Sequence, residues 1–167
     1  MSDSRSQRYQ ARVITVSSRA AAGEMQDASG PFLAQLLADI GLDVTGTDVI
    51  PDQRLAIQKT VIRHTDFAPV SLLALTGGTG PTPDDLTPEA LAPLLDRRYD
   101  GLGVAIHEDA RQKVPRAPLS RTIVGARART VILALPGSPG GVRDALASLT
   151  PVLPHLLALT SGLSDPH

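Results

Sequence analysis

Two glycine-rich loops are the features of this 167-residue chain whose composition and spacing first suggest chemistry. The first loop, TGGTG, spans residues 76–80, and the second, LPGSPGG, spans residues 135–141. Each follows an apolar run and precedes a helical pattern. Glycine allows a ligand to approach the backbone closely, and the amides of such a loop can bind an anion. The two loops therefore indicate an anion site; the simpler alternative is a tight turn between a strand and a helix.

Two aspartates follow apolar runs in the same way. Asp52 comes after Ile50 and Pro51, and Asp85 lies just after TGGTG, next to Asp84. If the strands are parallel, Asp52 and Asp85 emerge at the same edge of the sheet as the glycine loops. Two carboxylates beside phosphate-binding amides suit magnesium-assisted phosphoryl chemistry. On the residues alone, a nucleotide or phosphate site and simple helix capping both stay open.

Other common catalytic motifs are absent. No GK[ST] follows TGGTG, Pro83 breaks a GxGxxG fingerprint, and no serine lies in a GxSxG motif, which disfavours a serine hydrolase. The absence of cysteine excludes disulfides and thiolate metal sites. Arg127 and Arg129 are predicted to belong to a solvated turn. Four histidines lack metal-ligand spacing, and surface or capping roles are predicted for them: His64, His107, His155 and His167.

Composition narrows the class of partner. The formal net charge of -1 provides no global field that favours nucleic acid or an acidic membrane surface, and aromatic residues make up only 2% of the chain. The first residues are polar and lack the apolar core of a signal peptide, and no apolar run approaches the ~20 residues that span a bilayer. We therefore expect a cytoplasmic protein that binds neither nucleic acid nor membrane.

Strand and helix patterns alternate along the chain and must position these residues. The alternation predicts an α/β fold: a three-layer, doubly wound, mostly parallel sheet with helices on both faces. One domain is predicted over residues 12–160, between a flexible tail at residues 1–11 and a C-terminal tail at residues 161–167. Strands are predicted at residues 12–18, 43–50, 69–76 and 129–135. Helices are predicted at residues 31–40, 51–64, 87–98, 104–113, 142–149 and 151–163, with loop or irregular structure at residues 19–30 and 114–125.

A family resemblance adds to this picture. TGGTGPTPDDLTPEAL, together with LSRTIVG and LPGSPGGVRDAL, resembles the molybdopterin-binding family of molybdenum cofactor biosynthesis, especially its stand-alone molybdopterin adenylyltransferases. The resemblance runs from about Arg12 to His155. It implies an α/β fold assembled as a homotrimer or hexamer. It also implies transfer of AMP from Mg-ATP to the terminal phosphate of molybdopterin, release of pyrophosphate, and hand-over of the product to a molybdate-insertion protein.

The resemblance also implies roles for individual residues. Asp52 and Asp85 match the acidic pair associated with Mg²⁺ and catalysis. Ser120 and Arg121, in the LSR element, match positions near the pterin, and Ser17 matches a polar position after the first strand. The positions around the phosphates and the second ligand loop are matched by Thr76, Gly77, Gly78, Thr79 and Gly80, and by Pro136, Gly137 and Ser138.

The chain departs from the family pattern at three positions around the ligand mouth. Ser18 stands where an Asp is frequent, Asp84 where a basic residue is frequent, and Val104 where a Glu is frequent. These departures keep open a module of the same fold that binds or delivers molybdopterin without adenylylating it. A phosphoanhydride hydrolase is a further alternative, because a related domain occurs in competence-damage-type proteins.

Overall fold

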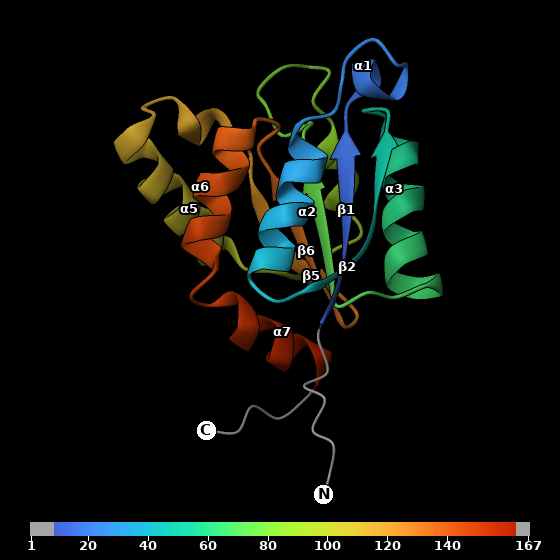
Figure 1. Cartoon of the computed structure of the whole chain (residues 1–167), viewed down its shortest axis with the longest axis vertical. Coiled ribbons are helices and arrows are strands. Elements are labelled where there is room, and N and C mark those ends of the chain that lie inside the picture. The colour runs from blue at the N-terminus through green and yellow to red at the C-terminus, as the bar shows by residue number, and fades with distance from the viewer. Residues whose placement is uncertain (1–8, 163–167) are drawn as a thin grey trace, which may run out of the picture.

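A single six-stranded sheet forms the centre of the molecule (Figure 1). The computed structural model describes residues 9–162. In the sheet the strands have the order β2-β1-β3-β6-β5-β4, and the four strands β2, β1, β3 and β6 are parallel, whereas β5 and β4 are antiparallel to their neighbours. The strand bounds are β1 Gln10–Val16, β2 Asp43–Ile50, β3 Leu72–Thr76, β4 Arg97–Arg98, β5 Ile123–Arg127 and β6 Thr130–Leu135.

Helices cover both faces of this sheet, as Figure 1 shows for α2 and α6 in front of the strands and α3 beside them. One hydrophobic cluster joins α2, α5, α6 and α7 to one face, and a second joins α3 and α4 to the other. The helix bounds are α1 Ser18–Ala21, α2 Ser29–Asp39, α3 Arg54–Ile62, α4 Thr87–Leu91, α5 Asp100–Lys113, α6 Pro139–Leu149 and α7 Leu153–Ser161, with a π-helix, η1, at Arg63–Phe67 and a 3₁₀ helix, η2, at Ala117–Leu119.

The central strands are buried on both sides, which is why they read as continuous apolar runs. In β3, Leu72 and Ala74 pack into the first cluster, and Leu73 and Leu75 pack into the second. Such two-sided burial is typical of a parallel strand covered by helices on both faces. The predicted three-layer, mostly parallel α/β fold is confirmed.

The predicted elements need correction at the antiparallel edge. Residues 123–125, predicted as irregular, begin β5, and the helix predicted over 87–98 ends at Leu91. Pro93 explains the early end, because a proline lacks an amide hydrogen and disfavours helical geometry in the residue before it. The chain then forms β4, which pairs with β5.

Smaller corrections concern the helix and strand limits. The short helix α1 takes in Ser18, predicted as the end of a strand, and residues 19–21, predicted as loop, and α5 begins at Asp100 rather than at residue 104. Strand β1 begins at Gln10, inside the predicted tail 1–11. Residues 1–8 of that tail, and residues 163–167 of the C-terminal one with His167, lie outside the described residues. Across residues 9–162, no helix is long and apolar enough to cross a membrane.

Two side chains predicted at the surface are bound within the fold. His64 lies in η1 and is buried, with its Nε2 3.6 Å from the carboxylate of Asp48. Arg127, predicted in a solvated turn, is the last residue of β5, and its guanidinium donates hydrogen bonds of 2.9 and 2.7 Å to the two carboxylate oxygens of Asp66. Arg129 does lie exposed in the following turn.

Candidate functional site

The loops that follow the parallel strands all leave the sheet at its upper edge in Figure 1. Ser17 follows β1, Asp52 follows β2, and the two glycine loops follow β3 and β6. Ligands of open α/β sheets bind beyond this carboxyl edge. The fold therefore brings the predicted residues to one place.

The two glycine loops are joined to each other. The hydroxyl of Thr76 donates a 2.7 Å hydrogen bond to the carbonyl oxygen of Pro136, and the Gly77 amide donates to the Leu135 carbonyl at 3.2 Å. A Cβ atom on Gly137 would stand 3.2 Å from the Gly77 Cα atom, so the loops are in close backbone contact. Thr76 and Pro136 therefore form part of the loop framework.

Three consecutive amides of the first loop have no hydrogen-bond partner in the described fold. Within residues 9–162, the N–H groups of Gly78, Thr79 and Gly80 donate no hydrogen bond. Gly77 and Gly78 have φ angles of 100° and 63°, in the left-handed region that favours glycine. Successive amides in such a turn form a concave site for an anion such as phosphate.

Thr87, the first residue of α4, holds this loop in shape. Its hydroxyl donates to the Gly77 carbonyl at 2.9 Å, and its amide donates to the Gly78 carbonyl at the same distance. Thr87 is fully buried. A Cβ atom on Gly78 would collide with the Thr87 hydroxyl, so the loop requires glycine there.

The two predicted acids lie against the same loop. A Cβ atom on Gly78 would be 2.5 Å from Oδ2 of Asp52, and one on Gly80 would be 2.6 Å from Oδ2 of Asp85. The Asp52 carboxylate accepts from the Leu86 amide at 3.0 Å. Both predicted acids therefore stand beside the unpaired amides.

Short hydrogen bonds fix the position of each acid. Oδ2 of Asp85 accepts from the amide and hydroxyl of Thr82 at 3.0 and 2.5 Å. The amide of Asp52 donates to the hydroxyl of Ser18 at 3.0 Å. Ser18, one of the departures from the family pattern, thus supports the acid that follows β2.

Negative charge is concentrated at this point. The pKa of Asp52 is raised, first because the carboxyl is partly buried and then because Asp85, Asp84 and Glu89 lie near it; the hydrogen bond from Leu86 opposes these effects. A cation bound beside Asp52 would relieve this repulsion.

The acid pair fits Mg²⁺ held jointly with a substrate phosphate. Oδ2 of Asp52 and Oδ1 of Asp85 accept no hydrogen bond from residues 9–162, so each has an oxygen free to coordinate. The same residues include no group of three or more His, Cys, Asp or Glu side chains placed to hold a metal. Mg²⁺ characteristically binds through one or two carboxylates, substrate phosphates and water.

Arg121 is bound to the first glycine loop and to the segment that follows it. Its guanidinium donates to the carbonyl oxygens of Gly80 at 3.0 Å and Asp85 at 2.8 Å, and it forms an ion pair with Glu89. Its backbone amide also donates to the Thr79 carbonyl at 2.7 Å. The hydrogen bond from Arg121 lowers the pKa of Glu89. Arg121 therefore anchors the segment that carries Asp85.

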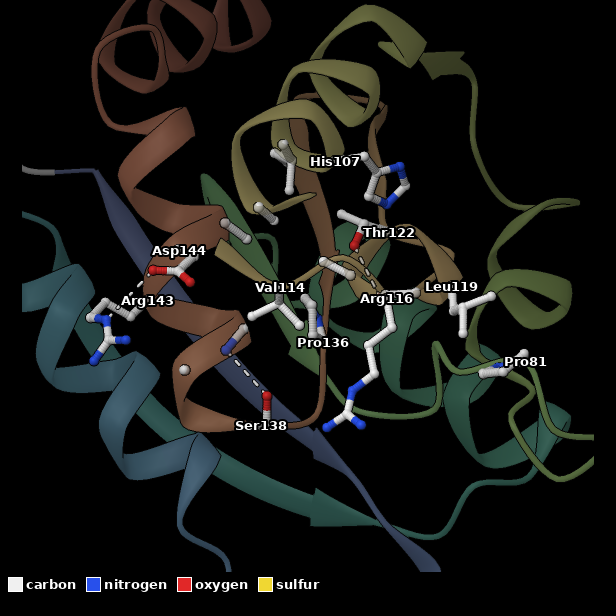
Figure 2. A pocket seen from close by; sticks show the side chains of 17 residues that line it. Pro81, His107, Val114, Arg116, Leu119, Thr122, Pro136, Ser138, Arg143 and Asp144 are labelled. Atoms are coloured by element: carbon white, nitrogen blue, oxygen red, sulfur yellow. Dashed lines mark hydrogen bonds and ion pairs between the residues drawn. The ribbon is translucent and has the colours of Figure 1, made fainter. Parts of the chain in front are cut away.

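Hollows lie on both sides of the joined loops. One, of about 450 Å³, lies between the loops and the start of α2 and is lined by Thr15, Ser17, Asp27 and Ser138, among others. The other, of about 500 Å³, lies between α5 and α6 and is also lined by Ser120 and Ser138 (Figure 2). The joined loops therefore lie between two hollows.

The serines at these hollows also have structural partners. Ser17 caps α1 by accepting from the Ala20 amide at 3.2 Å, and Ser138 caps α6 by accepting from the Gly141 amide at 3.1 Å. The Ser120 hydroxyl lies 3.0 Å from that of Thr79.

Sequence reasoning missed several residues at this site. Thr87, Glu89 and Asp27 were not predicted; Asp27 accepts from the Thr15 hydroxyl at 2.7 Å and from the Gly30 amide at 3.0 Å. An acid just before a Ser-Gly-Pro helix start was the available signal for Asp27. Thr87 and Glu89 lie in the quoted TPEA stretch, but only their tertiary partners show their roles.

Comparisons with known proteins agree with this geometry. A family model described as "Probable molybdopterin binding domain" matches residues 12–155. A molybdopterin adenylyltransferase from Helicobacter pylori J99 is 32% identical over 152 residues, which cover 90% of this chain and 86% of the relative. Gephyrin from Dictyostelium discoideum is 35% identical over 160 residues, covering 90% of this chain but 22% of gephyrin.

A solved structure shares the fold over nearly its whole length. The crystal structure of the molybdopterin biosynthesis enzyme MoaB from Thermus thermophilus superposes with a TM-score of 0.87 at 39% sequence identity. The match covers 92% of this chain and 97% of that one.

Proposed function

The chain belongs to the molybdopterin-binding domain family of molybdenum cofactor biosynthesis, and we propose that it is a molybdopterin adenylyltransferase. In this reaction the terminal phosphate of molybdopterin attacks the α-phosphorus of ATP. The bond between the α- and β-phosphates breaks, AMP is transferred, and pyrophosphate leaves. The observation that carries the proposal is the row of unpaired amides at Gly78–Gly80 with Asp52 and Asp85 beside it, between two hollows.

The protein's own groups would act mainly by positioning and by stabilising charge. The amides of Gly78, Thr79 and Gly80 would bind phosphate oxygens and stabilise the charge that develops on the transferring group. A general base is unnecessary, because a phosphate monoester is largely ionised at neutral pH. Holding both substrates on one rigid pair of loops would supply much of the acceleration.

Asp52 and Asp85 are the residues that would hold Mg²⁺ together with the nucleotide. The ion would supply charge neutralisation between two polyanionic substrates. Asp85 is held from both sides, by Thr82 at its carboxylate and by Arg121 at its carbonyl, so its carboxylate would be presented in a defined place.

The assembly and setting of the reaction are part of the same proposal. We expect a homotrimer or hexamer that works in the cytoplasm, where ATP is available, and passes its product to a molybdate-insertion protein. Light scattering would distinguish the trimer from the hexamer.

One observation favours a second candidate, a module that binds or delivers molybdopterin without adenylylating it. Asp84 is exposed and adds to the negative charge around Asp52. Extra negative charge opposes the approach of a second polyanion unless a cation neutralises it.

A direct assay separates these functions. Purified protein incubated with Mg-ATP and molybdopterin should release pyrophosphate and form adenylyl-molybdopterin. Asp85→Asn should abolish the reaction with little change in unfolding temperature, whereas the neighbouring Asp84→Asn should retain it. Tight molybdopterin binding without product would support the delivery module, and pyrophosphate-bond cleavage without any pterin would support a hydrolase.

A further inference from the structure

The hollow between α5 and α6 has the size and lining of a site for a small ring system. We call it the α5–α6 hollow (Figure 2). Its volume of about 500 Å³ lies in the range of small-molecule pockets. Aliphatic side chains from three segments line it: Ile106, Ala110, Val114, Leu119 and Ala145. Such walls suit the flat faces of a heterocycle, because they bury its apolar surface without needing aromatic partners.

The α5–α6 hollow adjoins the phosphate-binding loops. Pro136 and Ser138 of the second glycine loop line it, and so does Pro81, which directly follows Gly80. Ser120, also in the lining, contacts Thr79 through its hydroxyl. A ligand whose phosphate lies at the loops is therefore next to the hollow that can take its ring.

Arginines lie in or beside the α5–α6 hollow, and they differ in their partners. Arg121 is bound by acceptors of Gly80, Asp85 and Glu89, and Nε of Arg143 lies 3.6 Å from the Asp144 carboxylate. Arg116 is exposed and forms no hydrogen bond or ion pair with any described residue from 9 to 162. In Figure 2 its side chain extends toward the Ser138 end of the hollow, so its guanidinium is available to a ligand there.

The charges of the two substrates differ in how they can be neutralised. ATP would bring Mg²⁺, which Asp52 and Asp85 can hold, whereas a phosphate monoester acceptor needs a cation from the protein. A guanidinium is well suited to this, since it can bind phosphate through two parallel hydrogen bonds. Of the two arginines that line the hollow, Arg116 is the one without an acid partner in the described part of the chain.

With the ring of the phosphorylated acceptor in the α5–α6 hollow, we propose that Arg116 binds the phosphate of that acceptor. Arg116 then selects phosphorylated over unphosphorylated pterins. This assignment rests on the proposed adenylyl transfer for the identity of the acceptor.

Binding measured without ATP tests the assignment. Arg116→Gln should raise the Kd for molybdopterin roughly tenfold, as expected for loss of a charge-assisted contact, and Arg116→Lys should raise it less. Arg143→Gln is the matched control, because Arg143 lines the same hollow but has an acid partner, and it should change the Kd less than about twofold. A dephosphorylated pterin should bind all four proteins with similar affinity, and the KM for ATP should stay unchanged in Arg116→Gln.

Two results would overturn the assignment. One is an unchanged Kd for molybdopterin in Arg116→Gln, and the other is a rise in the KM for ATP alone, which would place the nucleotide in this hollow. The wild-type protein separates this test from that of the enzyme function. If it binds molybdopterin through Arg116 but transfers no AMP, the adenylyltransferase fails and the binding assignment stands.

Discussion

The hydroxyl of Thr76 and the carbonyl oxygen of Pro136, sixty residues apart in the chain, form a 2.7 Å hydrogen bond that ties the two glycine loops together. Thr76 ends β3 and is fully buried, while Pro136 follows β6 directly. Strands β3 and β6 are neighbours in the sheet, so the bond closes the pair of loops at the point where their strands end. The amides that we propose bind phosphate and the α5–α6 hollow thus share one framework.

Removing this bond should loosen the site. Thr76→Val keeps the shape of the side chain but leaves the Pro136 carbonyl without its donor, and we expect a loss of about 1 kcal/mol in the free energy of unfolding. Thr76→Ser keeps a hydroxyl and should retain more of the activity. Denaturant unfolding and steady-state kinetics measure the two effects. Equal activity in both variants would show that the bond does not matter for function.

Arg121 should act through the loop that it anchors. Arg121→Met removes the contacts to Gly80, Asp85 and Glu89, so the carboxylate of Asp85 should lose its fixed place. We expect roughly a tenfold fall in kcat and a higher Mg²⁺ concentration for half-maximal activity. Arg121→Lys should recover only part of this loss, because a single ammonium cannot replace the guanidinium fork.

A second arginine provides the control for that experiment. Arg127, at the other end of β5, donates to the Asp66 carboxylate and to the Leu94 carbonyl, the same types of acceptor that Arg121 binds. Arg127→Met should lower the unfolding temperature but leave kcat and the Mg²⁺ requirement unchanged. A similar loss of activity in both variants would mean that Arg121 contributes only general stability.

Asp52 should contribute to activity at the expense of stability. Its pKa is raised in the fold, so its ionisation destabilises the folded protein as the pH rises from 3.8, the ordinary value, through that raised pKa. Asp52→Asn keeps an acceptor for the Leu86 amide and should unfold at a higher temperature than wild type at neutral pH. The difference should shrink as the pH falls toward that ordinary value, where the wild-type carboxyl becomes protonated.

The same variant should be inactive and should respond less to magnesium. Thermal unfolding with and without Mg²⁺ and a nucleotide provides the measurement, and wild type should gain more stability than Asp52→Asn. An equal gain in both proteins would argue against Asp52 as a magnesium ligand.

His64 should make stability depend on pH below 6.5, its ordinary pKa. Its pKa is lowered from 6.5, mainly by burial and then by Arg12, while Asp48 acts in the opposite direction. The neutral imidazole is therefore favoured in the fold. Its contribution to the free energy of unfolding is present above pH 6.5 and is lost as the pH falls through the lowered pKa. The difference in unfolding free energy between wild type and His64→Gln should therefore shrink as the pH falls below 6.5. A constant difference in unfolding free energy would contradict this.

Some features of the antiparallel edge could not be predicted from local pattern. The turn between β5 and β6 is formed by Ala128 and Arg129, and Ala128 has a φ of 49°, where glycine or asparagine is the usual residue. Because Ala128 and Arg129 are not typical turn residues, the sequence did not indicate that residues 123–127 pair with β6 as a hairpin. β4 consists of only two arginines, and its strand character comes entirely from pairing with β5.

The sequence by itself determined the layered α/β fold and the place of the site. Runs such as residues 72–76 must be buried on both faces, and glycines or acids directly after such runs must emerge at the carboxyl edge of a parallel sheet. This is why Asp52 and Asp85 could be placed together from spacing alone. The family resemblance rested on the same local stretches.

Only the tertiary structure decided what each of these residues contacts. Arg121, predicted beside the pterin, is bound to carbonyls of Gly80 and Asp85, while Arg116, which was not predicted, lies at a hollow and has no partner among residues 9–162. The physical reason is that a hydrogen bond depends on direction and distance between groups far apart in the chain, such as Arg121 with Glu89 and Thr76 with Pro136. Local pattern places a side chain at an edge of the sheet, but its partners are set by how the neighbouring loops pack.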